Sequence, residues 1–248
     1  MSTESRTPAT AVSVTVVMPA YNEQDGIHTA VAAVQTHILN VIPGAELLIV
    51  NDGSRDNTAA IVDSIVAADA RIRALHTPNG GHGMALMRGL AAAAGDYVFL
   101  VDSDDQIPLD PFAKFWELAH RDTRGLDGVF GIRRVRHDAQ LRIVLTAVIR
   151  AALMMLFGVR ITDSNVPFKL VRRQVWLDAR RYISDDTLAP SLFLALYMKR
   201  AGCTLQFVDV VHRDRMAGEV SIRRWKLVKF CACAFRQLLG FRSAIRHI

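Results

Sequence analysis

An apolar run that ends in two acidic residues constrains this chain more than any other part of its sequence. Tyr97–Val101 is apolar throughout, which predicts a strand buried on both faces of a sheet. Asp102 and Asp104 follow two positions apart, so on an extended backbone their side chains point the same way. Two like charges this close resist ionising together, and a divalent cation is the usual remedy. The pattern favours a Mg²⁺ or Mn²⁺ site that also binds a diphosphate, although acids here are also typical of a cap for a helix near Pro111.

The residues before this run alternate between strand, polar loop and helix. Val12–Met18 is rich in β-branched residues, and Ile27–Leu39 has the composition of a helix. Glu46–Val50 predicts a second strand, which polar residues including Asp52 follow before a helix that runs through Ala68. This alternation predicts an α/β fold with a mostly parallel sheet, and open sheets of that kind bind ligands beyond the carboxyl ends of their strands.

A glycine-containing loop, Asn79–Gly83, separates an expected strand at Ile72–His76 from a helix expected over Met84–Ala94. Glycines let the backbone approach a ligand closely, and the N–H groups of a helix N-terminus attract phosphate. The spacing fits neither the dinucleotide fingerprint nor the Walker loop. Small residues at helical spacing equally predict a helix face packed tightly on the sheet: Ala85, Gly89 and Ala92.

Charge and composition restrict the partners of the chain. The net charge of +6 favours an anionic partner such as nucleic acid, acidic lipid or a phosphorylated substrate. The 3 cysteines form neither a disulfide framework nor a zinc spacing, which is typical of a reducing compartment. Residues 1–11 lack the apolar segment of a signal peptide and are expected to be disordered. The apolar run Ala151–Val159 is much shorter than the ~20 residues of a spanning helix, so we expect no membrane crossing.

Four motifs stand in one order along the first half of the chain: Val17–Glu23, Ile49–Thr58, Asn79–Asp96 and Asp102–Asp104. Together they resemble the nucleotide-sugar-binding half of the family 2 glycosyltransferases, which adopt the GT-A fold. The resemblance implies a Rossmann-like, mostly parallel sheet flanked by helices in a domain over residues 12–221. One departure is His82, because many relatives carry lysine or arginine between the glycines.

In the enzymes that the chain resembles, the loop after the first strand and a strand-tip aspartate hold the base and ribose of the donor, and the acidic pair holds the metal on its diphosphate. The resemblance implies a UDP- or GDP-linked sugar as donor and Mg²⁺ or Mn²⁺ as cofactor. The implied nucleotide-sugar-binding residues are Pro19, Tyr21, Asn22, Glu23, Asp52, Gly81, Gly83, Asp102 and Ser103. The metal ligands are Asp102 and Asp104, and Gln106 continues the alternate spacing either as a third ligand or as a surface-loop residue.

The second half resembles enzymes whose acceptor is a polyprenyl phosphate. Thr162–Arg173 is similar to a segment of the dolichyl-phosphate mannose synthase type of enzyme, with a Val-Pro pair in place of Cys-Gly. Arg215–Ser221 resembles a loop that closes over donor and acceptor phosphates, and a solvated charge run is the alternative. The resemblance implies Arg133 and Arg215 as cations that hold both anionic substrates. The implied acceptor-binding residues are Lys169, Arg172 and Ser221.

An acidic pair, Asp185 and Asp186, precedes a helix expected over Leu188–Ala201. In family 2 enzymes that act on hydroxyl acceptors, an acid near this helix start is the general base, whereas capping accounts for only one of the two. Further strands are expected at Asp127–Gly131 and Gln206–Val211. The apolar segment over residues 141–158 is expected as a core helix or an interfacial helix.

The last segment, residues 222–248, mixes arginine and lysine with bulky apolar residues and has no acid after Glu219. This is typical of an amphipathic helix on an anionic membrane surface, where each nearby cation adds ~1 kcal/mol. Nucleic acid is not expected as a partner, because no aromatic-rich RNA motif or zinc module accompanies the charge. The expected location is the cytoplasm, peripherally attached to the inner face of the membrane.

Three functional hypotheses follow. The first is an inverting, metal-dependent transfer of a sugar from a nucleotide diphosphate to a polyprenyl phosphate, with Asp104, Arg133 and Arg215 in the catalytic site. The second keeps the donor but uses a soluble hydroxyl acceptor, with Asp185 or Asp186 as general base. The third is an inactive nucleotide-sugar-binding module that anchors a partner at the membrane.

Overall fold

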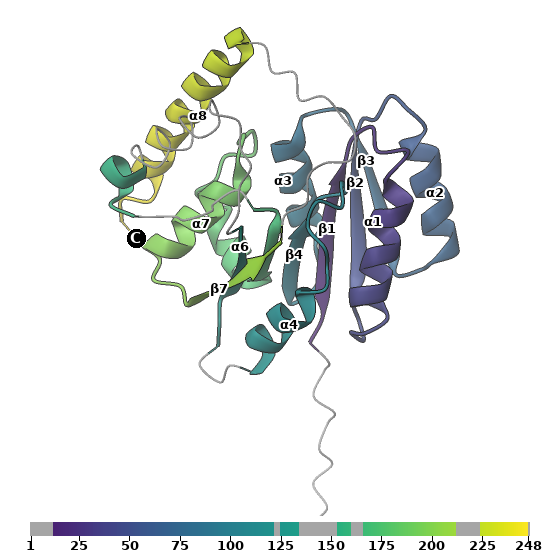
Figure 1. Cartoon of the computed structure of the whole chain (residues 1–248). Helices are drawn as coiled ribbons and strands as arrows, with labels where there is room; N and C mark the ends of the chain where they lie inside the picture. Colours follow the sequence, from purple (N-terminus) through teal and green to yellow (C-terminus); the bar gives the residue numbers. More distant parts are fainter. Residues whose placement is uncertain (1–11, 122–124, 134–152, 160–165, 212–223, 248) are drawn as a thin grey trace, which may run out of the picture.

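The computed structural model describes residues 12–121, 125–133, 153–159, 166–211 and 224–247. Within them a seven-stranded sheet has the order β3-β2-β1-β4-β6-β5-β7 and lies between helices on both faces (Figure 1). The strands are β1 (Val14–Ala20), β2 (Glu46–Asp52), β3 (Ile72–Thr77), β4 (Tyr97–Val101), β5 (Gly128–Arg133), β6 (Phe168–Arg172) and β7 (Leu205–Val210). β6 runs antiparallel to β4 and β5, and the other neighbouring pairs are parallel.

Alternate side chains of the central strands enter two separate apolar cores. Val16 and Met18 of β1 face one core, and Val17 faces the other. The first core is covered by α1 (Ile27–Val34), its π-helical continuation η1 (Gln35–Leu39), α2 (Thr58–Ala68) and α4 (Phe112–Arg121). The second is covered by α3 (His82–Ala92), α6 (Arg173–Ala179), α7 (Pro190–Arg200) and α8 (Arg224–Ala244). Strands buried on both faces explain the continuous apolar runs in the sequence.

The expected α/β class, mostly parallel sheet and flanking helices are confirmed. The ends of the strands in the first half differ by a few residues from the sequence-based bounds. The expected disorder of residues 1–11 and most of the helix expected over 141–158 lie outside the described residues, although residues 153–157 are helical. The antiparallel β6 was not expected, because a local apolar pattern does not encode the direction of a strand.

The C-terminal helix is not a separate appendage. Figure 1 shows α8 beside α7, on the side of the molecule away from α1 and α2. Leu238, Phe241 and Ile245 of α8 are buried in the second core. The Phe241 ring lies 5.0 Å from that of Phe193 on α7, edge to face. The end of α8 therefore packs into the core, and the domain boundary expected at residue 221 stays a prediction.

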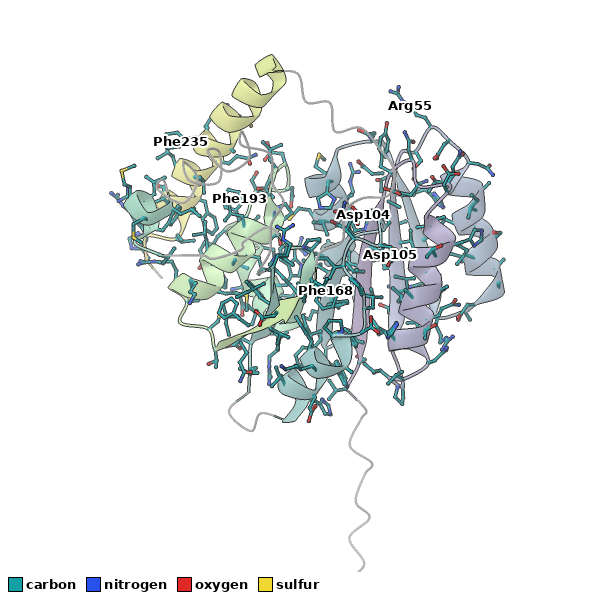
Figure 2. All side chains as sticks on the ribbon, in the orientation of Figure 1. Arg55, Asp104, Asp105, Phe168, Phe193 and Phe235 are labelled. Carbon is teal, nitrogen blue, oxygen red and sulfur yellow. The ribbon has the colours of Figure 1, made fainter. Side chains whose placement is uncertain are left out.

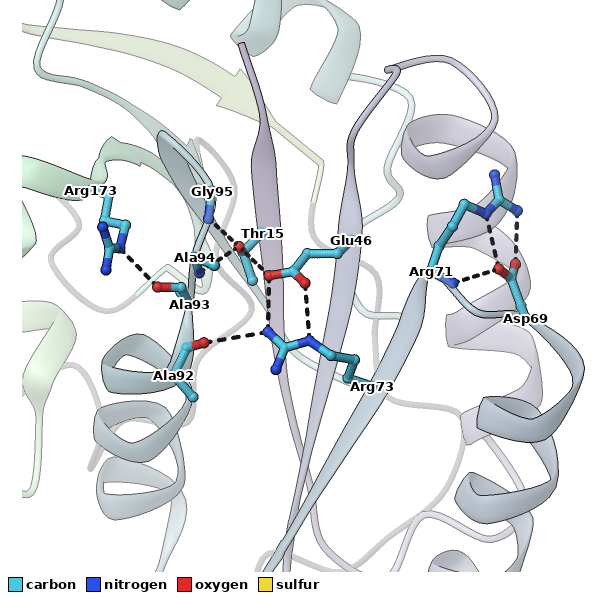
Figure 3. A network of polar contacts seen from close by, with 10 residues as sticks. All are labelled: Thr15, Glu46, Asp69, Arg71, Arg73, Ala92, Ala93, Ala94, Gly95 and Arg173. Carbon is cyan, nitrogen blue, oxygen red and sulfur yellow. Dashed lines mark hydrogen bonds and ion pairs between the residues drawn. The ribbon is translucent and has the colours of Figure 1, made fainter. Parts of the chain in front are cut away.

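A polar network ties the strands together at the edge where β1, β2 and β3 begin (Figure 3). Glu46 accepts two hydrogen bonds from the Arg73 guanidinium, each 3.0 Å long, and one of 2.7 Å from Thr15 Oγ1. Thr15 Oγ1 in turn accepts hydrogen bonds from the backbone N–H groups of Ala94 and Gly95. Burial raises the pKa of Glu46, but the bonds from Arg73 and Thr15 outweigh it and lower the pKa overall. The opposite edge, at the carboxyl ends of these strands, carries the four motifs.

Candidate active site

A pocket of about 460 Å³ opens at the carboxyl ends of β1, β2 and β4. β1 lies between β2 and β4, so the strand order changes direction here, as it does at the ligand sites of open α/β sheets. Its lining residues are Pro19, Ala20, Tyr21, Glu23, Asp52, Asn79, Gly81, His82, Ala85, Asp102, Ser103 and Asp104. The fold thus brings all four sequence motifs to one pocket.

Asp102 carries a buried oxygen beside this pocket that has no hydrogen-bond partner among the described residues. The Asp102 side chain is 29% exposed, but this oxygen, Oδ1, is buried. Burial raises the pKa of Asp102 to about 6, against a lowering by His82, and Asp104 raises it further. His82 Nε2 lies 3.7 Å from Oδ1, which is too far for a hydrogen bond. An orphaned carboxylate oxygen costs free energy, so this position fits a bound cation.

Asp104 continues the site toward β5. Its Oδ1 accepts a 3.2 Å hydrogen bond from the backbone N–H of Gln106. Asp102 and Asp104 also line a smaller cavity of about 110 Å³, with Gln106 and Arg133 on its walls. Gln106 lines this second cavity and is not among the lining residues of the larger pocket, and its role as a third metal ligand stays a prediction.

The acidic pair does not act as a helix cap. α4 begins at Phe112, whose N–H donates to the backbone oxygen of Leu109 at 2.9 Å.

In the part of the chain that the structure describes, no group of three or more His, Cys, Asp or Glu side chains is arranged to hold a metal. Two carboxylates alone suit Mg²⁺ or Mn²⁺, which keep several positions for water and phosphate oxygens.

Asp52 lines the pocket and also bonds to the glycine loop, and its expected contact with the base or ribose stays a prediction. The Asp52 side chain is 4% exposed. Its Oδ1 accepts the Gly80 N–H at 2.8 Å and its Oδ2 accepts the Gly81 N–H at 2.7 Å. Arg88 Nη1 lies 3.4 Å from Oδ1. Both carboxylate oxygens are therefore used to shape the glycine loop that walls the pocket.

Asn22 bonds to the loop after β2, and its expected contact with the donor stays a prediction. Its backbone is left-handed, with φ 54°, and it does not line the pocket. The Asn22 N–H donates to Ser54 Oγ at 3.0 Å, and the Asn22 Oδ1 accepts the Arg55 N–H at 2.8 Å. Asn22 thereby joins the loops after β1 and β2, whereas Pro19, Tyr21 and Glu23 line the pocket as expected.

Gly83 packs against protein rather than facing the pocket. A Cβ on Gly83 would lie 2.5 Å from the backbone oxygen of Thr187 and 2.9 Å from that of Leu188. Glycine is therefore required for the start of α3 to meet the segment before α7. Further along α3, Ala85 and Gly89 face the sheet as expected, but Ala92 is exposed.

Two of the expected acceptor-binding residues lie on β6. Lys169 is fully buried, and its Nζ donates to the backbone oxygen of Val166 and, at 2.7 Å, to Ser191 Oγ. Arg172 Nε donates to the backbone oxygen of Leu126 at 2.8 Å. Because β6 is antiparallel to β4, Arg172 pairs with Tyr97 at the far end of β4 from Asp102. Both side chains are bonded to protein in the structure, and their expected contacts with an acceptor stay predictions.

The remaining expected residues divide into three groups. Arg133 ends β5 and lines the small cavity with the acidic pair, which agrees with its expected role without testing it. Arg215 and Ser221 lie outside the described residues. Asp185 and Asp186 are exposed, and neither caps α7, whose N-cap residue Ala189 forms no side-chain cap bond. Ser184 Oγ donates a hydrogen bond to Asp186 Oδ1.

A second pocket, of about 450 Å³, lies between the α6–α7 connection and α8. Asp186 and Thr187 line it from one side, and Gln237 and Phe241 line it from α8. Gln237 belongs to none of the sequence motifs. It comes near Asp186 only when α8 packs against the domain, so no local pattern could indicate its role. His82 departs from the residue that many relatives carry, but its proximity to Asp102 emerges only in the fold.

The sheet order, the pocket at its switch point and the acidic pair define a protein with the GT-A fold of nucleotide-sugar-dependent transferases. The chain belongs to glycosyl transferase family 2, whose family model matches residues 15–176. The family resemblance of the sequence is thus confirmed. Among the described residues, no helix is both long enough and apolar enough to span a bilayer.

Comparisons with individual proteins give the same picture. The chain is 27% identical over 225 residues to an undecaprenyl-phosphate 4-deoxy-4-formamido-L-arabinose transferase from Sodalis glossinidius, over 90% of this chain and 66% of that protein. It is 29% identical to the protein of the same name from Pseudomonas fluorescens, over 87% and 61%. The chain thus spans 61–66% of these relatives.

A solved structure confirms the fold. The glucosyl-3-phosphoglycerate synthase from Mycobacterium tuberculosis, in complex with Mn²⁺, UDP and phosphoglyceric acid, superposes with a TM-score of 0.62. The match covers 94% of this chain and 78% of that chain, at 21% sequence identity.

Proposed function

We propose that this protein transfers a sugar, with inversion, from a UDP- or GDP-linked donor to a polyprenyl phosphate. The buried and unpartnered Oδ1 of Asp102, at the wall of a pocket of about 460 Å³, carries the proposal. That volume lies in the range typical of cofactor-sized ligands. The curated relatives, whose names specify undecaprenyl phosphate, support the acceptor class.

Asp102 and Asp104 are the residues that would hold Mg²⁺ or Mn²⁺ on the donor diphosphate. When bound, the cation would neutralise charge on the leaving nucleotide. The Mn²⁺ bound with UDP in the M. tuberculosis synthase supports this cofactor class. His82, the first residue of α3, lines the same pocket and suits the diphosphate oxygens.

Arg133 lies on the other side of the acidic pair and is proposed to hold the acceptor phosphate. A guanidinium offsets the repulsion between two anionic substrates and orients the acceptor oxygen toward the sugar. That oxygen forms the bond to the anomeric carbon while the bond to the nucleotide diphosphate breaks on the opposite face. An ionised phosphate carries no proton to remove, so this route needs no general base. Arg215 and Ser221 remain predicted members of a closing loop.

A hydroxyl acceptor is the second candidate, and the acids before α7 favour it. Asp186 is exposed and does not cap α7, so its carboxylate is not needed to begin the helix. Thr187 and Leu188, which follow it, contact Gly83 at the start of α3. In this route Asp186 or Asp185 accepts the proton of the attacking hydroxyl.

Peripheral attachment to an anionic membrane is proposed for α8. Phe235 and Leu239 are 48% and 45% exposed, and Arg242 is also exposed. These residues follow at spacings of four and three, so they share one face of the helix. Figure 2 shows Phe235 on α8, well away from Asp104. An apolar and cationic face suits the inner membrane surface, where a polyprenyl acceptor would be found.

The test incubates the protein with UDP- and GDP-sugars, Mn²⁺ and a short-chain polyprenyl phosphate, and follows labelled product into the organic phase. We expect product with one donor class and a loss of about 10²-fold or more in Asp104→Asn. Asp186→Asn should keep phosphate transfer but lose hydroxyl transfer by about 10²-fold. If the protein binds a nucleotide with Mn²⁺ yet turns over no donor, the transferase proposal fails and the binding-module hypothesis replaces it.

A further inference from the structure

The inner face of α8 is bonded to the segment that carries the acidic pair before α7. Gln237 Oε1 accepts the Leu188 N–H at 3.0 Å and lies 3.5 Å from the Thr187 hydroxyl that donates to it. Gln237 Nε2 donates to the backbone oxygen of Asp186 at 3.1 Å. One side chain therefore satisfies both a donor and an acceptor of the backbone over three consecutive residues.

Apolar contacts hold Gln237 in register with this segment. The neighbouring Leu238 is 5% exposed, and Phe241, one turn further along, is 4% exposed. The Phe241 ring lies 5.0 Å from that of Phe193 and 6.1 Å from that of Phe157. These contacts fix the rotation of α8, so that the carboxamide of Gln237 faces the segment 186–188.

The opposite side of the same segment contacts the wall of the donor pocket. The backbone oxygens of Thr187 and Leu188 leave no room for a Cβ on Gly83. Gly83 is the second residue of α3 and follows His82, which lines the pocket and lies 3.7 Å from Asp102. A continuous set of contacts therefore runs from α8 through residues 186–188 to the start of α3.

Local contacts of the segment include the hydrogen bond from the Thr187 N–H to the Ser184 oxygen at 3.1 Å, but no side-chain cap joins it to α7. Ala189 at the N-cap of α7 provides no side-chain cap bond, and Pro190 at the first helical position has no N–H to donate. Gln237 bonds to backbone groups just before the helix, the Leu188 N–H and the Asp186 carbonyl oxygen. The orientation of the segment thus depends also on a helix that is distant in sequence.

We infer that Gln237 is a positioning residue: it holds the segment 186–188 between α8 and the N-terminus of α3, and so sets the position of Asp186 and of the pocket wall around the donor. The catalytic consequence rests on the proposed transferase function, whereas the positioning contact does not. The outer face of α8 is the proposed membrane face. Attachment of α8 would therefore act on the active site through this side chain.

Three variants of the full chain test the inference. Gln237→Leu keeps the volume of the side chain and removes all its hydrogen bonds. Gln237→Glu keeps an acceptor for the Leu188 N–H but replaces the donor that faces the Asp186 carbonyl. Ser243→Ala, at an exposed position of the same helix, is the control. Amide hydrogen exchange, nucleotide-binding stoichiometry and the kcat and KM of sugar transfer are measured for each.

In Gln237→Leu we expect exchange over residues 184–189 and 80–85 to rise about tenfold, because several hydrogen bonds are lost. Exchange over residues 192–198 should stay unchanged, and nucleotide should still bind in a one-to-one ratio. The kcat should fall about tenfold with the donor KM within about twofold. Gln237→Glu should lie between wild type and Gln237→Leu, and Ser243→Ala should match wild type.

Unchanged exchange over both segments, or an unchanged kcat in an active enzyme, overturns the inference. Exchange that rises equally over α7, with loss of nucleotide binding in both Gln237 variants, also overturns it, because it shows global destabilisation. If the wild type transfers no sugar, the proposed function fails, and the exchange data still decide whether Gln237 positions the segment.

Discussion

Replacing Gly83 by alanine tests the contact between α3 and the segment before α7. The added Cβ would lie 2.5 Å from the Thr187 oxygen, 2.9 Å from the Leu188 oxygen and 3.0 Å from the Leu188 carbonyl carbon. All three atoms belong to backbone, so relief requires movement of a chain segment rather than of a flexible side chain. Overpacking of this kind costs about 1–3 kcal/mol, and the better helix propensity of alanine returns up to ~1 kcal/mol.

We therefore expect Gly83→Ala to lower the free energy of unfolding by about 1–2 kcal/mol, which corresponds to a fall in Tm of about 2–8 °C for a chain of this size. Thermal and urea denaturation measure the change. Gly240→Ala is the matched control, because nothing lies within 4 Å of a Cβ at that helical position. It should be neutral or slightly stabilising. A Gly83→Ala protein as stable as wild type, with equal nucleotide affinity, would refute the close contact and its role in the pocket wall.

Three further predictions concern charge and surface. Asp102→Asn should stabilise the metal-free protein at pH 7.5 by about 1–2 kcal/mol, because burial makes the ionised acid unfavourable in the fold. It should also abolish the stabilisation by Mn²⁺ that thermal-shift assays measure. A variant less stable than the wild type contradicts this prediction. Arg73→Gln should lower the free energy of unfolding at pH 7 by about 0.5–1 kcal/mol, since Arg73 is partly exposed. Because the pKa of Glu46 is lowered from its ordinary 4.5, the difference in free energy of unfolding between wild type and Arg73→Gln should shrink as the pH falls below 4.5. Urea denaturation at several pH values measures it, and a difference that stays constant would contradict the prediction. The double substitution Phe235→Ser and Leu239→Ser should weaken binding to anionic vesicles about tenfold or more with no loss of Tm. Unchanged cosedimentation with the vesicles would exclude this face of α8 as the membrane contact.

Much of the candidate site could be predicted from sequence because the motifs sit at strand ends. The runs before Pro19, Asp52 and Asp102 form strands that are parallel in the structure. Parallel neighbours expose their carboxyl ends at one edge, so polar residues that follow different strands meet there. Local pattern and one topological rule placed polar residues at the strand ends, and the family resemblance assigned them to one site.

Other contacts of the expected site residues could not be predicted from the sequence, for a different reason. Lys169 and Arg172 lie on β6, whose antiparallel direction carries Arg172 away from the acidic pair and buries Lys169 beside Ser191. The apolar pattern of a short strand does not show whether the strand runs parallel or antiparallel to its neighbours. That direction depends on the segments that connect the strand to the rest of the sheet. Motif similarity likewise could not indicate that Asp52 bonds to the backbone of the glycine loop.

Local patterns in the chain were enough to predict the α/β class, the two-sided burial of the central strands and the edge of the sheet where acidic and glycine-rich segments gather. These features follow from periodicity and composition, which act over a few residues at a time. The direction of β6, the packing of Gly83 against residues 187–188 and the bonding of Gln237 to the same segment became visible only once the elements were packed together. Those contacts join residues far apart in the chain, and their geometry is set by how whole elements pack rather than by the residues beside them.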